Sequence, residues 1–313
     1  MVYLIRDKDE VLIKRIILLR VINHHIFLKI LTQRGKKMIN SIYKRISTRT
    51  YKNEILSDDE IKEIMKVVNT HQNIKGPFGN NFNFTFNLNS SNQPQGQKIG
   101  TYGIIKNVPA FVGGVSKNTM ESIIDFGFVF ENLLLSLTAK GFDTCWLGGT
   151  FKRKEYREQL LDNEIIPAIS PIGHRAKKRS LIEATMRKLA GAQNRISKDI
   201  LFKQYQNELP VDMMNKSSIN TCLELVQLGP SASNKQPWRL YVDNNVIHFY
   251  IERTNKYPSV SLGYDIQALD IGIALCHFSI GLQRFEKTFI YQKFGNMKTF
   301  SNQDYIISIQ INP

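Results

Sequence analysis

The clearest pattern in the sequence is the stretch 122–140, which carries apolar side chains nearly all round and stops at Gly141. Such a stretch predicts a helix that is buried on every side and ended by a glycine. An earlier helix is predicted after Ser57, because Ser57 and Glu60 form a capping-box pattern ahead of apolar residues at helical spacing. This second helix is expected to be amphipathic and about twelve residues long.

Strand patterns lie between the two predicted helices. The alternation of Phe82, Phe84 and Phe86 indicates an edge strand, and residues 110–112 indicate a buried one. The rest of residues 73–100 is rich in Asn, Gln, Gly and Ser, which is typical of loops. The predicted order is therefore helix, loop, strand and buried helix.

The later part of the chain repeats this order. Residues 123–127, Ile-Ile-Asp-Phe-Gly, are echoed by residues 268–272, Ala-Leu-Asp-Ile-Gly, at an offset of 145. A helix through residues 223–226 matches the one that ends near Val68, at an offset nearer 160. The first copy must therefore hold extra loop, which we place after Asn80. Together, the echo and the shared order predict a diverged tandem duplication.

Charge is the unusual feature of the composition. The 313 residues include 42 Lys and Arg against 27 Asp and Glu, a formal net charge of +15. The hydrophobic content of 42% and the charged content of 22% are ordinary and exclude wholesale disorder. The length fits two modest domains or one large one. The positive excess indicates an anionic partner, which is a nucleic acid, a membrane surface or a phosphorylated small molecule.

Part of that charge lies at the N-terminus. Residues 1–37 hold nine Lys or Arg and three acidic residues, a net +6. Lys14, Arg15 and Arg20 interrupt the apolar runs well short of the roughly 18 apolar residues that a membrane span needs, and no signal-peptide pattern is present. Two interpretations stay open: a basic amphipathic helix on an anionic membrane, or a translated extension ahead of a domain that starts at Met38. We prefer the extension.

Three cysteines, Cys145, Cys222 and Cys276, lie far apart and form no Cys-x-x-Cys pair. This spacing argues against a zinc site and favours a reducing compartment, so we expect a cytoplasmic protein without a bound metal. Each cysteine is expected to be a small core residue.

The segment 45–49, Arg-Ile-Ser-Thr-Arg, is the first candidate binding motif. In an extended segment, Arg45, Ser47 and Arg49 face the same side, and two guanidinium groups with a hydroxyl would grip a phosphate. The alternative is a solvated basic run ahead of a helix.

The most specific signal is the polar loop 230–238, Pro-Ser-Ala-Ser-Asn-Lys-Gln-Pro-Trp, which follows a predicted helix end at Gly229. Small hydroxyl and amide side chains allow the backbone to approach a flat polar ligand and to hydrogen-bond its edge. A plain turn is the alternative, because Pro, Ser and Asn are turn formers.

Two further clusters attract attention. Gly148 and Gly149 expose backbone N–H groups or form a simple turn. The basic cluster 177–179, Lys-Lys-Arg, offers contacts to an anion or forms a solvated face. His174 precedes it, but no Cys or Ser nucleophile is paired with this histidine, so we expect it to be packed or exposed to solvent.

Together, the four clusters resemble the nitroreductase-like FMN flavoproteins, most closely the subfamily whose single chain contains two fused, diverged half-copies. The resemblance covers about residues 42–311. It implies an α+β fold, a pseudo-dimer with antiparallel-type sheets and central buried helices. The implied divisions are a basic extension at 1–37, a first half at 38–187 and a second half at 188–313.

The resemblance also implies which residues bind FMN. In that family the Arg-x-Ser-x-Arg motif grips the phosphate and ribityl chain, the polar loop lines the isoalloxazine from the partner subunit, the glycine turn lies near flavin N5, and a late basic pair closes on the phosphate. The arginine motif corresponds to Arg45, Ser47 and Arg49, and the polar loop to Pro230, Ser231, Ala232, Asn234 and Gln236. The glycine turn corresponds to Leu147, Gly148 and Gly149. The basic pair falls among Lys177, Lys178 and Arg179, with the choice between the two lysines open.

One FMN per chain is implied. Ordinary members are homodimers with FMN at each subunit interface, whereas here the first half would supply the arginines and glycines, and the second half the polar loop. The other pseudo-site lacks these parts, because residues 74–80 stand where the polar loop would be and Arg195-Ile196-Ser197 is only a partial echo of the motif. No basic closing cluster stands near Ile309. A monomer would therefore suffice.

The implied function is an FMN-dependent NAD(P)H oxidoreductase that passes hydride through flavin N5 to a nitroaromatic, quinone or related small-molecule acceptor by a ping-pong cycle. No catalytic side chain is required, and the amides of Gly148 and Gly149 would hydrogen-bond N5 or O4. Two alternatives stay open. One is a flavoprotein that binds FMN without turnover or acts on flavin itself. The other is a basic nucleic-acid or membrane-surface binder, although no recognised nucleic-acid module is present. We expect neither nucleic-acid binding nor stable membrane insertion.

Overall fold

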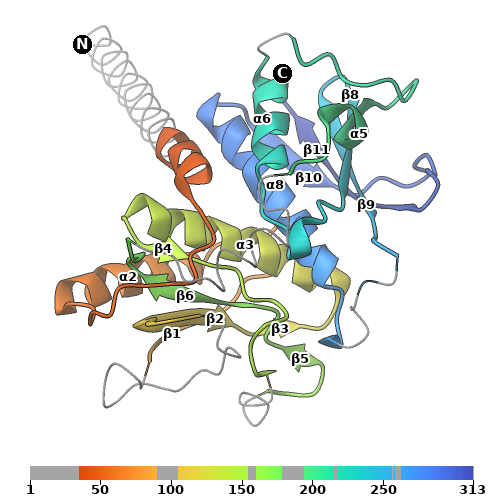
Figure 1. The fold of residues 1–313 in the computed structure, drawn as a ribbon. Helices are drawn as coiled ribbons and strands as arrows, with labels where there is room; N and C mark the ends of the chain where they lie inside the picture. The colour runs from red at the N-terminus through yellow and green to blue at the C-terminus, as the bar shows by residue number, and fades with distance from the viewer. Residues whose placement is uncertain are drawn as a thin grey trace, which may run out of the picture.

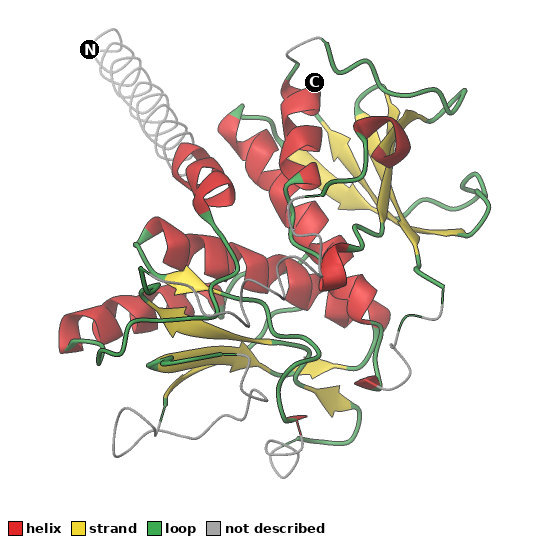
Figure 2. Cartoon of the chain, viewed as in Figure 1, coloured by secondary structure: helices red, strands yellow, loops and turns green. Residues whose placement is uncertain are grey.

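The structure is a computed structural model, shown by position along the chain in Figure 1 and by secondary structure in Figure 2. It describes residues 35–89, 105–153, 160–177, 194–214, 217–255, 257 and 262–312. Most of the predicted N-terminal extension therefore lies outside the described residues. A helix over residues 35–44 crosses the expected start at Met38 and buries Met38 and Ile42 in the main hydrophobic core.

The first half has the predicted order of elements. Ser57 caps α2 and shares a complete capping box with Glu60, which confirms the sequence prediction for this helix. Gly141 follows the buried helix α3 with a positive φ of 95°, a conformation that glycine adopts without strain. The elements of this half are α2 (Asp58–His71), β1 (Phe84–Leu88), β2 (Ala110–Gly114), β3 (Ser116–Lys117), α3 (Met120–Ala139), β4 (Asp143–Thr144), β5 (Glu164–Ile165) and β6 (Ile169–Gly173).

The second half begins with a short helix and strand of its own and then repeats the plan of the first. Its elements are α5 (Lys198–Leu201), β7 (Phe202–Gln204), α6 (Ser218–Gln227), the 3-10 turn η2 (Ala232–Asn234), β8 (Trp238–Asp243), β9 (Val246–Glu252), α8 (Ile266–Arg284), β10 (Phe289–Gln292) and β11 (Gln303–Ile311).

The strand orders of the two main sheets confirm the duplication. The first sheet has the order β1-β2-β6-β4, and the second has β8-β9-β11-β10 with β7 added beside β8. All pairings within these sheets are antiparallel except that of β7 with β8. Asn244 and Asn245 alone join β8 to β9, whereas β1 and β2 are separated by residues 89–109. The extra loop of the first copy therefore lies after Asn80, as predicted.

The two central helices, α3 and α8, pack directly against each other between the halves (Figure 1). Their repeated glycines make this close approach possible. A Cβ atom on Gly127 would lie 2.3 Å from Leu269 O, and one on Gly272 would lie 2.0 Å from Ile124 O. Both glycines therefore mark the place where the helix backbones meet.

The repeated aspartates have an equally matched role. Asp125 accepts hydrogen bonds from the amides of Phe78 and Asn80 in the loop after α2, both at 2.9 Å. Asp270 accepts one from the amide of Ala232, 3.0 Å away, in the loop after α6. Each aspartate thus anchors the loop of its own half, and residues 74–80 are the structural counterpart of the polar loop 230–238.

Helices α3 and α8 are also long and apolar enough to cross a membrane by length and composition alone. Within their most apolar windows, however, 78% of α3 and 94% of α8 is buried inside the protein. This burial is what the apolar pattern of residues 122–140 predicted, and it fits core helices of the two-half fold.

Candidate functional site

The Arg-x-Ser-x-Arg segment runs beside β4 in the first half. Ser47 forms a parallel bridge with Thr144, and the amide of Thr48 donates to Thr144 O at 3.0 Å. Two guanidinium atoms of this segment, Nη1 of Arg45 and Nε of Arg49, are buried without a hydrogen-bond partner among the described residues. Buried donors are normally paired, so these two point to a ligand that accepts hydrogen bonds.

A buried carboxylate lies beside Arg45. Glu131 of α3 is fully buried, and its Oε1 atom is 3.7 Å from Nε of Arg45. The carboxylate also accepts hydrogen bonds from Trp146 Nε1 at 2.7 Å and from His277 Nε2 at 3.0 Å. Glu131 therefore contacts Arg45 of the arginine motif, Trp146 just before the glycine turn, and His277 on helix α8 of the second half.

The neighbours of Glu131 set the direction of its pKa and the orientation of the His277 ring. Burial raises the pKa of Glu131, but the charge of Arg45 and the hydrogen bonds from His277 and Trp146 outweigh burial and lower the pKa overall. His277 Nδ1 lies 2.8 Å from Leu225 O, and a carbonyl oxygen can only accept, so Nδ1 carries a hydrogen. Nε2, on the other side of the ring, faces Glu131 Oε1 at 3.0 Å.

The polar loop 230–238 is folded around its own side chains. Ser231 Oγ accepts from the amide of Gln236 at 2.9 Å, and Gln236 Oε1 accepts from the amide of Ile196 at 3.1 Å. Asn234 donates from Nδ2 to Asn194 O at 2.7 Å. Asn234 and Gln236, which the resemblance assigns to FMN, thus also fasten the loop to residues 194–196.

The backbone of this loop is strained. Ser233, Asn234 and Gln236 have φ values of 48°, 56° and 48°, in the left-handed region that side chains other than glycine rarely adopt. Strain of this kind costs of order 1–3 kcal/mol per residue and is concentrated at functional sites. Its presence at three residues of one short loop singles out this loop as a candidate site.

The glycine turn of the first half rests on the second half. Tyr264 is almost completely buried, and its hydroxyl donates to Pro167 O at 2.7 Å and contacts Gly148 O at 3.3 Å. Arg153 donates from Nη2 to the same two carbonyls. A Cβ on Gly148 would lie 2.8 Å from Ile266 Cδ1. The Gly148 carbonyl is therefore fixed by contacts from both halves.

Only part of the basic cluster can be placed. Lys178 and Arg179 lie outside the described residues, and Lys177 is exposed. The segment before Lys177 runs beside the residues that follow Arg49, because the amide of Ala176 donates to Thr50 O at 3.0 Å. The chain thus enters the basic cluster next to the arginine motif.

His174 is a packed residue, as expected. Its Nε2 lies 2.7 Å from Glu60 Oε1, and its ring stacks on Phe142 with centroids 5.5 Å apart. The three cysteines are also as predicted, because all three are free thiols buried in the protein.

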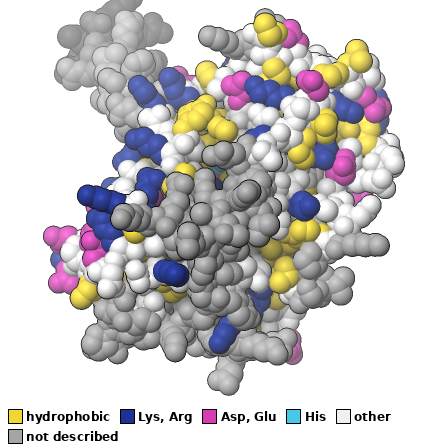
Figure 3. Space-filling view, viewed as in Figure 1, with side chains coloured by type: hydrophobic (Ala, Val, Ile, Leu, Met, Phe, Trp, Pro, Cys, Tyr) yellow, Lys and Arg dark blue, Asp and Glu magenta, His cyan; other side chains and the backbone are white. Residues whose placement is uncertain are grey.

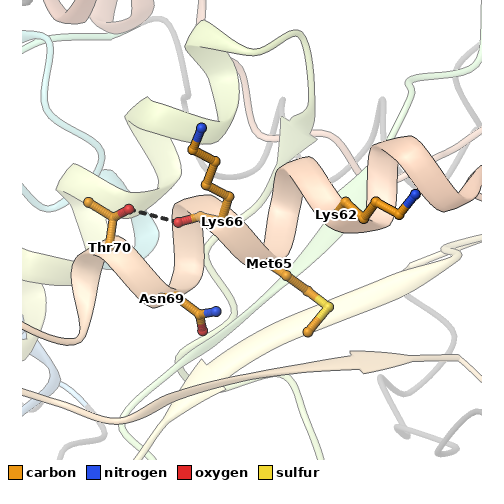
Figure 4. Close-up of a pocket in the computed structure, with 5 residues that line it drawn as sticks. All are labelled: Lys62, Met65, Lys66, Asn69 and Thr70. Carbon is orange, nitrogen blue, oxygen red and sulfur yellow. Dashed lines mark hydrogen bonds between the residues drawn. The ribbon is translucent and has the colours of Figure 1, made fainter.

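A shallow groove of about 560 Å³ lies elsewhere, on helix α2. Figure 4 shows that Lys66 points to one side of this helix while Met65 and Asn69 point to the other, so the lining side chains do not converge on one point. Lys and Arg side chains gather along the left side of Figure 3, where Figure 1 places the helix of residues 35–44 and α2. None of the four motifs contributes to the groove lining, and we do not assign it to the site.

Sequence reasoning missed the residues that support the motifs from a distance, namely Glu131, Trp146, Arg153, Tyr264 and His277. One of them had a visible signal. Glu131 is one of two carboxylates, with Asp125, within the apolar run 122–140, and an acidic side chain is rarely buried unless it is paired. The sequence around the other four residues shows no unusual pattern, and only their contacts in the structure connect them with the motifs.

Fold and site define a two-half α+β protein in which Glu131 and Gly148 contact the second half, and in which Arg45 and Arg49 carry donors without a partner among the described residues, suited to an anion. Residues 37–282 match the protein family described as "Putative TM nitroreductase". The chain belongs to this family. The matched residues begin within the helix of residues 35–44 and end within α8.

A solved structure that covers most of the chain shares the fold, and shorter ones are similar to about half of it. The crystal structure described as a putative nitroreductase from Thermotoga maritima MSB8 is 19% identical, with a TM-score of 0.55, over 88% of this chain and 94% of that chain. A nitroreductase with bound FMN from Bacteroides fragilis is 17% identical, with a TM-score of 0.34, over 46% of this chain and 91% of that chain. An FMN-dependent nitroreductase from Clostridium difficile is 16% identical, with a TM-score of 0.33, over 45% and 88%. No curated protein matches the sequence.

Proposed function

We propose that the protein is an FMN-dependent oxidoreductase that takes hydride from NAD(P)H and passes it to a small-molecule acceptor such as a nitroaromatic or a quinone. The observation that carries the proposal is the pair of buried, unpartnered donors on Arg45 and Arg49, in the motif that this family uses for the flavin phosphate. Membership of the nitroreductase family supports it.

The charge of the site favours an anionic ligand. Arg45 and Arg49 bring two positive charges to the motif, whereas Glu131 beside Arg45 brings a single carboxylate. A buried excess of positive charge is costly unless an anion is bound. A phosphate monoester provides the charge and accepts hydrogen bonds from guanidinium groups in a two-pronged geometry.

FMN, when bound, supplies a hydride-accepting N5 atom, and the protein supplies binding, orientation and electrostatics. The turn at Gly148 and Gly149 is suited to orientation. Among the described residues, none accepts a hydrogen bond from the amides of these glycines, while the Gly148 carbonyl is held by Arg153 and Tyr264. Both amides are therefore fixed in position and available to the edge of a flat ring.

The remaining parts of the proposal follow from the two-half fold. One FMN would bind per chain, because the strained polar loop of the second half has no counterpart with the same side chains at residues 74–80. A monomer would suffice, and the free cysteines fit a cytoplasmic enzyme. NAD(P)H and the acceptor would use the same cleft in succession.

Reconstitution with FMN tests this function. The purified protein, incubated with FMN and freed of excess, is expected to be yellow, to hold one FMN per chain, and to lose its flavin absorbance when NADH or NADPH is added anaerobically. Arg49→Gln should lower FMN affinity by at least about tenfold, the effect of losing roughly 1.4 kcal/mol. Lys62→Gln, on the exposed face of α2, is the matched control and should bind FMN as the parent protein does.

Two results would contradict the proposal in different ways. A colourless protein after reconstitution would exclude FMN as the ligand. If FMN binds but neither NADH nor NADPH reduces it, the protein binds flavin without having the proposed activity. Salt-sensitive DNA binding that survives removal of residues 1–37, without flavin binding, would favour the nucleic-acid alternative.

A further inference from the structure

A guanidinium group and a phenol hydroxyl converge on the carbonyl side of the glycine turn. Arg153 donates from Nη2 to Gly148 O, and to Pro167 O at 2.8 Å. The same nitrogen lies 3.2 Å from the hydroxyl of Tyr264, and Arg153 Nε donates to Ile166 O at 3.0 Å. The Arg153 guanidinium therefore binds the glycine turn, the segment that leads into β6 and a side chain of the second half at once.

Ring contacts and burial hold these two groups in place. The Arg153 guanidinium carbon lies 4.5 Å from the centre of the Phe151 ring and 5.1 Å from that of the Tyr264 ring. Tyr264 is 5% exposed, and burial raises the pKa of its hydroxyl, which therefore keeps its hydrogen. Asn118 of the first half donates to Gly263 O at 2.9 Å and fastens the turn before Tyr264. A positive charge is thus held in a fixed position against the glycine turn.

Gly148 and Gly149 share one peptide group, so contacts at the Gly148 carbonyl act on the Gly149 amide. In a trans peptide the N–H points away from the carbonyl oxygen of the same group. The Gly149 N–H is therefore directed away from Arg153 and Tyr264, and no described residue accepts a hydrogen bond from it. A cation bound at the carbonyl also polarises the peptide group, which makes its N–H a stronger donor.

We propose that Arg153 and Tyr264 are positioning residues, which aim and polarise the Gly149 amide toward the edge of the flavin so that the site favours reduced over oxidised FMN. This inference rests on the proposed function and deepens it, because it names the groups that tune the redox state of the cofactor.

The preference follows from the charge that reduction adds. A hydride carries two electrons and one hydrogen nucleus from the reduced nicotinamide, which becomes its oxidised cation, and the flavin ring gains one negative charge. A fixed, polarised N–H donor stabilises that added charge more than it stabilises the neutral oxidised ring. Loss of the Arg153 charge should therefore weaken binding of reduced FMN more than binding of oxidised FMN.

Two measurements test this difference. Apo-protein is titrated with oxidised FMN, with flavin fluorescence as the readout, and the midpoint potential of bound FMN is measured against a reference dye during anaerobic reduction by dithionite. Together they give the Kd for reduced FMN, and neither depends on NAD(P)H. Arg153→Gln should cut the preference for reduced FMN about tenfold, a fall of about 30 mV in the two-electron potential. Tyr264→Phe should cut it roughly threefold, because one hydrogen-bonding group is lost while Arg153 still contacts Gly148 O.

Lys117→Gln is the matched control. Lys117 is exposed on β3, and its position pairs with Glu164 of β5, near Ile166. The variant removes the same single positive charge beside the segment that Arg153 contacts, and its potential and Kd should match those of the parent protein. If Arg153→Gln does not fold, Tyr264→Phe decides by the same comparison.

An unchanged potential in the folded variants would overturn the inference even if both bind FMN more weakly, because the two side chains would then only support the fold. An equal fall in potential in Lys117→Gln would overturn it too, since any nearby charge would have the same effect. Failure of the proposed function differs from both results, because the unaltered protein then binds no FMN or binds FMN that neither NADH nor NADPH reduces.

Discussion

Gly272→Ala tests how the two halves are joined. A Cβ at this position would lie 2.0 Å from Ile124 O and 2.6 Å from Phe128 N. Both are backbone atoms of α3, which cannot swing aside as the end of a side chain can. Ordinary van der Waals contact begins at 3.4 Å, so α3 and α8 must separate by roughly 1.4 Å, the difference between 3.4 and 2.0 Å.

The expected cost follows from two opposing terms. Extra atoms in a well-packed core cost about 1–3 kcal/mol, and a clash between backbones belongs at the upper end. Replacing glycine by alanine within a helix stabilises the helix by about 1 kcal/mol. We therefore expect the free energy of unfolding to fall by about 2 kcal/mol. FMN affinity should fall as well, because the bond of 3.0 Å between Glu131 and His277 crosses the same interface.

Urea unfolding monitored by tryptophan fluorescence provides the measurement, because the two tryptophans, Trp146 and Trp238, lie in different halves. Gly295→Ala is the control, since a Cβ there would meet no atom within 4 Å. If Gly272→Ala unfolds within about 0.5 kcal/mol of the parent protein, the size of an ordinary surface change, the close helix crossing is refuted. Equal destabilisation by Gly295→Ala would refute it too.

Two further predictions concern buried polar groups. Burial raises the pKa of Asp270 well above its ordinary value, because burial outweighs the hydrogen bond from Ala232. The folded state then keeps a proton that the unfolded state releases, so the contribution of Asp270 to stability is lost as pH rises. The Asp270→Asn variant should therefore gain stability relative to the parent protein between pH 5 and pH 8. Urea midpoints of the two proteins that shift in parallel between these pH values would contradict this. Tyr264→Phe removes the hydroxyl that donates to Pro167 O and should cost about 1 kcal/mol of unfolding free energy; unchanged urea midpoints would show that the cross-half contact to the Gly148 turn contributes nothing.

Much of the fold could be predicted because its signals are local. The capping box at Ser57 and the all-round apolar run 122–140 report only on neighbouring residues, and both helices form where predicted. The repeated Asp and Gly of the central helices were also visible in the sequence. Their offset identified the duplication before the matching strand orders confirmed it.

The motifs of the candidate site were recognisable for a similar reason. Each is a short run in which residue types and spacing carry the meaning, as in Arg45, Ser47 and Arg49 or in the polar loop 230–238. Their roles toward FMN stay predictions. The positive φ values within the polar loop add an independent reason to place a site there.

The sequence by itself determined two diverged halves, their helices and strands, and the short motifs, because periodicity and turn chemistry act over a few residues. Only the tertiary structure decided which distant residues serve those motifs. Glu131 contacts His277, which lies 146 positions further along the chain, and Arg195 donates a hydrogen bond to Asn234, which lies 39 positions further along. Such contacts depend on how α3 and α8 cross and how the loops fold back on them. No local pattern records that Glu131 lies beside Arg45, or that Arg195, in a partial echo of the arginine motif, holds the polar loop 230–238.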